Sequence, residues 1–125
     1  MMKNIIIDTQ TQTPIYKQLY DQISLQILSG TLASDSLLLS IRNTAKELRV
    51  SIITIKKTWE ILEQNGYIYT IAGKGSYVAK HTEKMISEKK YDIIETSISE
   101  QIILAKSLGY SKEVLIEMIH KIFSK

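Results

Sequence analysis

The sequence predicts an α+β fold with two parts. Between residues 40 and 66, two helical runs are separated by only three residues, Arg49-Val50-Ser51. A β-rich hairpin follows at 67–78, with glycines in its turn. After a polar, charged stretch that begins the tail as a linker or an exposed helix start, the apolar residues from Ile94 onward again recur at helical spacing. Two helices joined this closely and followed by a hairpin indicate a winged helix-turn-helix domain, here with a short C-terminal two-helix tail.

The chain begins with a short extended arm at 4–13 and a helix from Pro14 to Ser29. Pro14 suits the first turn of a helix, because the N–H it lacks would have no partner there. The apolar stripe of this helix is formed by Ile15, Leu19, Ile23, Ile27 and Leu28. We expect 31–39 to be a connector whose end, Leu37-Leu38-Leu39, pairs as a short strand.

The two central helices have the signals expected of a helix-turn-helix. The hydroxyl of Ser51 can cap the second helix, and Gly66 can end it by accepting a positive φ. The second helix has an apolar face that contains Trp59, so a place in the core is favoured over stacking on bases. In this motif the second helix enters the DNA major groove with its first turns leading.

The hairpin and the tail complete the predicted fold. We expect strands at 67–72 and 76–78, joined by the turn Gly73-Lys74-Gly75. The tail contains two helical runs, separated at 108–110, and Ser111 can cap the second. A two-helix segment of this size cannot bury a core alone, so it must pack on the first domain or on a second copy.

Composition and charge limit the possible classes of protein. The 125 residues have a net charge of +3, and residues 42–80 contain seven Lys/Arg against three Asp/Glu, which suits a polyanion partner. The absence of cysteine excludes disulfides and cysteine metal sites, and fits a reducing cytoplasm. The three isoleucines near the N-terminus are too few for a signal peptide or membrane span. We therefore expect a cytoplasmic protein with no membrane partner.

Several spaced motifs, PIYKQLYDQI, AKELRVS, LEQNGYI and GKGSYV, occur in one order over about residues 5–80. In this pattern the sequence resembles the GntR family of bacterial transcription regulators. The arm before Pro14 and the short tail resemble the YtrA-type subfamily, whose members lack a large effector-binding domain and dimerise through the tail. The resemblance implies a dimeric regulator, usually a repressor, often of a neighbouring transporter operon.

Three positions depart from the family pattern. Leu39 and Thr44 stand where the family usually has proline and leucine, which affects the turn and packing of the first motif helix. Ile52 stands where the family has a DNA-contacting arginine. Isoleucine cannot hydrogen-bond to a phosphate or a guanine edge, so binding is weakened or the preferred bases change.

Candidate DNA contacts follow from position and chemistry. Arg42 lies in the first turn of its helix, where a phosphate would relieve its conflict with the helix dipole; the alternative is a solvated arginine. Ser51 is either a cap or a phosphate contact, and Thr54 bonds either a phosphate or its own helix. Ile53 either touches thymine methyl groups or is a scattered exposed isoleucine, whereas Ile52 extends the core stripe.

Cations near these residues add candidates. Arg49 lies in the turn, Lys56 and Lys57 lie near the leading end of the second helix, and Lys74 at the hairpin tip can enter the minor groove. The alternative for each is a solvated surface charge. The candidate DNA-binding residues are Arg42, Arg49, Ser51, Ile53, Thr54, Lys56, Lys57, Gly73, Lys74 and Gly75.

Patterns typical of enzymes and metal proteins are missing. His81 and His120 have no second ligand nearby, Gly73-x-Gly75 is too short for a phosphate loop, and no serine lies in a nucleophile elbow. We expect no catalytic residue, no metal site and no cofactor. An enzyme fragment, as in relatives fused to an aminotransferase-like domain, is disfavoured because the tail is too short for such a domain.

The hypothesis is a sequence-specific, dimeric transcription regulator, with a winged helix-turn-helix DNA-binding domain at 1–80 and a helical dimerisation tail at 81–125. Its partners are double-stranded DNA and a second copy, held through 82–125. The alternative is a winged-helix protein-interaction module with weakened or lost DNA binding, which Ile52 and the small net charge leave open. The operator, the regulated genes and any small-molecule effector stay open.

Overall fold

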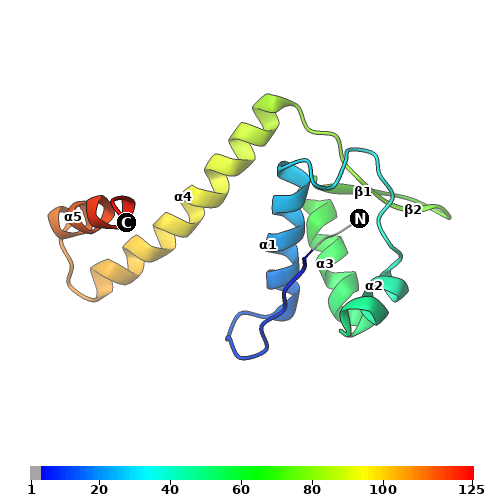
Figure 1. Ribbon diagram of the computed structural model, residues 1–125, viewed down its shortest axis with the longest axis horizontal. Coiled ribbons are helices and arrows are strands. Elements are labelled where there is room, and N and C mark those ends of the chain that lie inside the picture. Colours follow the sequence, from blue (N-terminus) through cyan, green and yellow to red (C-terminus); the bar gives the residue numbers. More distant parts are fainter. Residues whose placement is uncertain (1–3) are drawn as a thin grey trace. The chain divides into compact units, whose positions relative to one another are not determined.

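Helices and one small hairpin build the chain in the computed structural model, which describes residues 4–125 (Figure 1). The chain divides into two units, Met1–Glu83 and Lys84–Lys125. The elements are α1 (Ile15–Leu28), α2 (Ile41–Leu48), α3 (Ile52–Gln64), β1 (Ile68–Ile71), β2 (Gly75–Val78), α4 (Glu83–Ser107) and α5 (Lys112–Phe123). The α+β winged helix-turn-helix prediction is confirmed; residues 1–3 of the predicted first domain lie outside the described residues.

The core of the first unit forms around α3, which contacts α1, α2 and β1. The largest side chains with almost no exposure include Leu19, Ile23, Ile55, Leu62 and Val78. The members that share a helix lie four or seven residues apart, as the sequence pattern predicts. Trp59 is 4% exposed, so its ring belongs to the core. The first helix begins one residue later than predicted, because Pro14 has extended backbone angles and precedes it as the N-cap.

The N-terminal arm is held against α1 by two glutamine side chains. The Gln22 amide accepts the Ile6 N–H at 2.8 Å and donates to the Ile6 carbonyl at 2.6 Å. Gln18 makes the same pair of bonds with Asp8, each at 2.8 Å. Four residues of helix rise about 6 Å and two residues of extended chain span about 6.7 Å, so the two spacings match. The amides therefore take the place of a neighbouring strand.

The hairpin pairs β1 with β2 from Ile68↔Val78 to Ile71↔Gly75. Gly75 therefore lies in β2, and the predicted turn at 73–75 is wrong by one residue: the Lys74 N–H closes the turn on the Ile71 carbonyl at 2.9 Å. The predicted strand at 37–39 is reduced to one bridge, Leu37↔Tyr77. A longer strand does not form there, because the chain soon turns into α2, which begins at residue 41.

Tyr20 on α1 meets Tyr67 edge to face, with ring centroids 5.8 Å apart. Burial raises the pKa of Tyr20 to about 12, and the neighbouring Tyr67 and Asp21 add to the shift. The phenol pKa in an unfolded chain is about 10, so the folded protein holds this proton more tightly. The resulting stability is fully present below pH 10 and is lost as the pH rises toward 12.

We therefore expect the melting temperature of the natural chain to fall more steeply between pH 10 and 12 than that of Tyr20→Phe. Phenylalanine keeps the ring but has no proton to lose. Thermal melts followed by circular dichroism at several pH values measure the two slopes. Lysines deprotonate equally in both proteins, so they cannot cause a difference between the slopes. Identical slopes would contradict the assignment of this stability to the raised pKa of Tyr20.

The second unit consists of α4, α5 and the corner between them. The Tyr110 N–H bonds to the Ala105 carbonyl at 3.0 Å, Gly109 has a φ of +84°, and the Ser111 hydroxyl caps α5 through Val114 N–H. The predicted break and cap are confirmed. Neither helix has a buried residue. Within 4–125, no helix combines the length and apolar character that crossing a bilayer requires.

Candidate nucleic-acid interface

The turn between α2 and α3 is three residues long, Arg49-Val50-Ser51. Arg49 adopts left-handed backbone angles, φ 58° and ψ 43°, and its N–H returns to the Ala45 carbonyl. Left-handed angles reverse the chain abruptly at the end of a helix. Val50 also bonds to the Ala45 carbonyl, at 3.0 Å, so α2 closes before α3 begins. The predicted helix-turn-helix is confirmed in its helices and in its turn.

Two hydroxyls form the leading end of α3. The Ser51 Oγ accepts the Thr54 N–H at 3.1 Å, which makes Ser51 a cap. The Thr54 Oγ1 lies 2.8 Å from the Ser51 Oγ. One of the two hydroxyls donates to the other, so the other hydroxyl's hydrogen is left for an outside acceptor. The pair can therefore cap the helix and still offer a donor to a phosphate.

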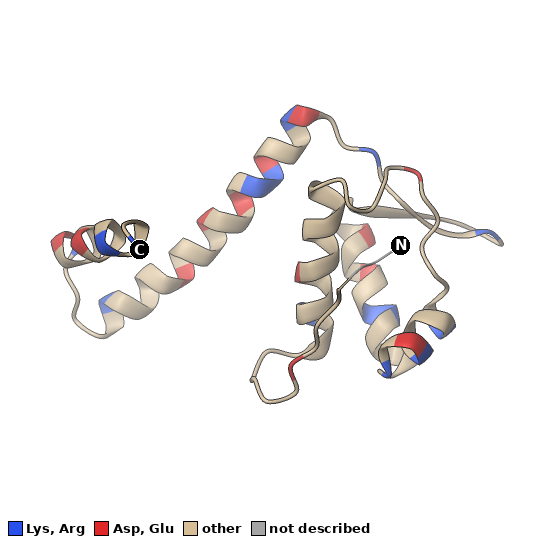
Figure 2. Ribbon diagram, viewed as in Figure 1, with Lys and Arg blue, Asp and Glu red and all other residues tan. Residues whose placement is uncertain are grey.

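Most of the candidate cations have no carboxylate partner. Ion pairs in the part of the chain that the structure describes include Lys17–Asp21 at 2.7 Å and Lys84–Glu88 at 4.0 Å. The exposed cations without such a partner include Arg42, Arg49, Lys56 and Lys74. Figure 2 shows Lys and Arg on α2, on α3 and at the hairpin tip. These charges are available to an outside anion.

Lys57 is placed differently from the other cations. Its Nζ lies 3.9 Å from the centroid of the Tyr16 ring on α1, a cation–π contact. Lys57 is thus turned toward α1, a contact that the sequence pattern did not predict. A phosphate contact by Lys57 would have to compete with this ring.

Arg42 lies at the second position of α2. The Ser40 hydroxyl caps this helix by accepting the Asn43 N–H at 3.1 Å. The first N–H groups of the helix, at Ile41 and Arg42, have no intrahelical acceptor. Guanidinium and free N–H groups together suit a phosphate oxygen. Sequence reasoning found Arg42 but did not identify Ser40 as the cap, although serine just before a helical run is an ordinary capping signal.

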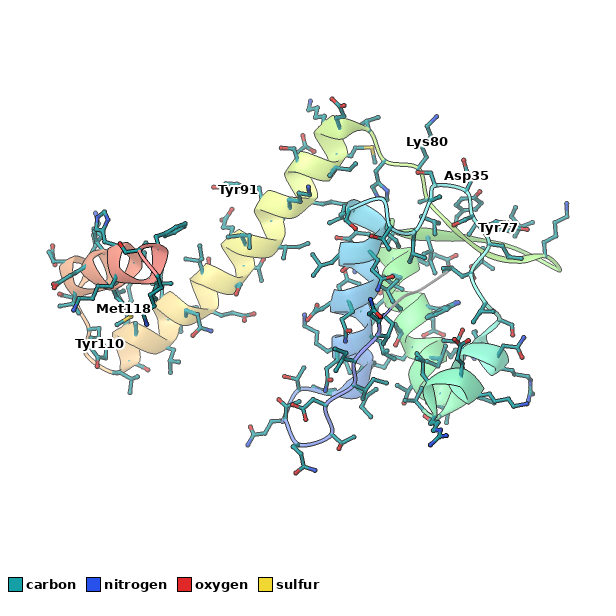
Figure 3. The ribbon with its side chains drawn as sticks, viewed as in Figure 1. Asp35, Tyr77, Lys80, Tyr91, Tyr110 and Met118 are labelled. Atoms are coloured by element: carbon teal, nitrogen blue, oxygen red, sulfur yellow. The ribbon has the colours of Figure 1, made fainter. Side chains whose placement is uncertain are left out.

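The hairpin is braced from the connector before α2. Tyr69 donates its hydroxyl hydrogen to Asp35 Oδ1 at 2.9 Å, and this bond raises the pKa of Tyr69. The Tyr69 and Tyr77 rings stack with centroids 5.5 Å apart. Figure 3 labels Asp35 and Tyr77 on these neighbouring segments. Sequence reasoning missed this brace, because nothing local connects residues 34 positions apart.

The tip itself carries Lys74 between two glycines with positive φ, Gly73 at 78° and Gly75 at 123°. A Cβ added at Gly75 would lie 3.1 Å from the Leu37 Cδ1, so a side chain there would press on the connector. The ten candidate residues thus fall on three stretches of the first unit: the start of α2, the turn with the front of α3, and the hairpin tip.

The arrangement of metal-binding side chains and the surroundings of His81 complete the description of the first unit. The described residues hold no group of three or more His, Cys, Asp or Glu side chains able to bind a metal ion. His81 has its Nδ1 3.0 Å from the Ala79 carbonyl and its ring 5.9 Å from that of Tyr67.

Comparison with known proteins identifies the family to which the chain belongs. No protein-family model matches the chain. The chain is 31% identical to the HTH-type transcriptional repressor YtrA of Bacillus subtilis. The alignment spans 118 residues and covers 94% of this chain and 91% of that protein. The chain belongs to the GntR family of transcription regulators, in its YtrA-type branch. As a GntR regulator it is not an enzyme, as the sequence predicts.

Solved structures of GntR regulators have the same fold. A GntR family transcriptional regulator from Listeria monocytogenes superposes with a TM-score of 0.71 and is 32% identical, over 90% of this chain and 97% of that one. The DNA-binding domain of AraR, solved in complex with the operator ORX1, is 25% identical with a TM-score of 0.55, over 61% of this chain and 95% of that one. The predicted resemblance to GntR regulators of the YtrA type is confirmed.

Proposed function

We propose that this GntR regulator represses transcription by placing the front of α3 in the major groove of an operator, with the hairpin tip at the adjacent minor groove. The observation that carries the proposal is the leading end of α3. There a hydroxyl donor from the Ser51–Thr54 pair is accompanied by Arg49 and Lys56, neither of which has a carboxylate partner. The similar AraR domain was solved in complex with an operator, which supports DNA as the partner.

The proposed contacts divide by chemistry. Phosphates would be held by Arg42, Arg49, Lys56 and the Ser51–Thr54 pair, which fix register and add salt dependence. Lys74 would enter the minor groove, where Gly73 and Gly75 allow close approach of the backbone. Lys57 is the least favoured of the ten, because its charge already rests on the Tyr16 ring.

We assign the DNA-binding domain to 1–80 and dimerisation to 81–125, with the contact through 82–125. The support is the tail's unburied apolar surface: α4 and α5 have no buried residue, and Phe123 is 86% exposed. A second copy of the same tail would cover this surface. Two copies would then offer two recognition helices to half-sites about 34 Å, or one DNA turn, apart. The same proposal includes an operator with twofold symmetry, a neighbouring transporter operon as the target of repression, and action in the cytoplasm.

Retention of genomic DNA tests the proposal directly. Chromosomal fragments are passed over the purified full chain at two salt concentrations, and the retained fragments are sequenced. We expect a few enriched sites at both concentrations, with weaker binding at the higher one. Equal retention of all fragments, or none, would contradict sequence-specific binding and would favour the protein-interaction alternative.

Removal of the Arg42 charge gives the sharpest single-residue test of the interface. We expect Arg42→Gln to weaken operator binding about tenfold and to lower the salt dependence by about one ion per protomer, because one phosphate contact is lost. Fluorescence anisotropy titrations over a range of salt measure both quantities. Lys17→Gln is the matched control, since it removes the same charge from α1 in an ion pair with Asp21. Equal affinities for Arg42→Gln and the natural chain would exclude the contact.

A further inference from the structure

Two isoleucines occupy the first turn of α3, where the proposed function places DNA. Ile53 is 79% exposed, the largest exposed fraction among the large apolar residues described in the first unit, and Ile52 is 43% exposed. The other apolar residues on the inner face of α3 are buried, among them Ile55, Trp59 and Leu62. The first turn of this helix thus presents exposed branched hydrocarbon beside the Ser51–Thr54 hydroxyl pair.

The two isoleucines lie on different sides of α3. Consecutive residues of a helix are about 100° apart, so Ile52 and Ile53 point in different directions. Ile52 lies three residues before the buried Ile55 and so borders the core. Ile53 precedes Lys56 by three residues and shares its exposed face. Ile53 therefore stands at the centre of the outward face, with Ile52 at its inner edge.

The major groove offers one apolar feature, the C5-methyl group of thymine. An isoleucine side chain has no donor or acceptor, so it cannot discriminate guanine, adenine or cytosine by hydrogen bonds. Contact with a methyl group would remove apolar surface of both partners from water. The flanking hydroxyls and cations can meanwhile hold the phosphates on either side.

We propose that Ile53, with Ile52 beside it, is a specificity-determining residue that contacts thymine methyl groups, so that each operator half-site has thymine at the position facing the start of α3. This inference rests on the proposed DNA-binding function. It assigns a base preference to two residues that otherwise have no partner for their exposed surface.

Selection from a random-sequence duplex library with the full chain identifies the preferred site. Each selected thymine is then replaced by deoxyuridine, which removes the methyl group and keeps every hydrogen-bonding atom. We expect the replacement facing Ile53 to weaken binding about fourfold per half-site, and about fifteenfold when both half-sites are changed. Deoxyuridine elsewhere in the half-site is the matched DNA control and should change little.

Protein variants complete a double-mutant cycle. Ile53→Ala should weaken binding to the thymine site by a similar factor and become insensitive to the deoxyuridine replacement. Leu25→Ala, an equally sized change at a 53% exposed residue of α1, should keep the natural sensitivity. In a repeat of the selection, Ile52→Arg should move the preference from thymine toward guanine, which arginine can contact with two hydrogen bonds.

The outcomes separate the two proposals. Enrichment of no sequence would overturn DNA binding and this inference with it. Enrichment of a site that is indifferent to deoxyuridine, or that Ile53→Ala binds with undiminished sensitivity to the methyl group, would overturn the inference and leave DNA binding intact. Loss of methyl sensitivity only in the Ile53 variant is the expected result.

Discussion

Ile98→Asp is expected to turn the proposed dimer into a monomer of 14.3 kDa and to weaken operator binding by about 10²–10⁴-fold. Ile98 is 48% exposed on α4 and lies between Ile94 and Ile102, one helical turn to each side. A second copy that covers this stripe would bury the new carboxylate without a partner, which is strongly unfavourable. Monomers lose the high effective concentration that links two half-site contacts.

Light scattering after size-exclusion chromatography gives the mass, and anisotropy titrations give the affinity at the same salt concentration. Thr96→Asp is the matched control: it adds the same charge two residues away, on the opposite side of the same helix. We expect it to remain a dimer. A natural chain that is monomeric, or an Ile98→Asp variant that stays dimeric, would show that the stripe is not the contact between copies.

The helix-turn-helix was predictable from sequence because its signals are local. Ser51 caps α3 through a backbone N–H three residues away, and the buried positions Ile55 and Leu62 recur at helical spacing. Gly66 has the left-handed φ, 77°, that its place after α3 predicts. Each of these features depends on residues within about two helical turns, so the order of the amino acids alone carries the information.

Features that depend on packing between distant segments were not predictable in the same way. Lys57 was expected to face DNA, but its ammonium group lies over the Tyr16 ring, 41 positions earlier in the chain. The brace of Tyr69 on Asp35 depends on how the connector crosses the hairpin. No periodicity or composition signal relates such pairs, so only the folded arrangement reveals them.

The candidate site also combines a feature that the sequence predicted with one that it did not. Periodicity alone placed Ile53 away from the core side chains of α3, and its 79% exposure agrees with that placement. Ile52 was expected to extend the core stripe, yet it is 43% exposed at the first position of α3. The end of a packed helix is therefore where a sequence pattern predicts burial least well and where contact with an outside partner is easiest.

Trp59→Ala is expected to destabilise the first unit by about 3–5 kcal/mol, since truncation of a buried aromatic side chain removes its contacts and leaves a cavity. Trp59 is 4% exposed and lies on α3, the helix that contacts α1, α2 and β1. Loss of this ring would loosen the packing that presents the front of α3. Such a loss is a large part of the stability of a typical small domain.

Urea unfolding followed by far-UV circular dichroism measures the change. All variants are compared at one protein concentration, because the proposed dimerisation would make stability depend on concentration. Fluorescence is unsuitable, since Trp59 is the single tryptophan. Trp59→Phe is the control and should restore most of the stability, because it keeps an aromatic ring in the core. An alanine variant that is as stable as the natural chain but no longer binds DNA would instead assign the indole to base contact, and would require that the helix turn its present core face toward the duplex.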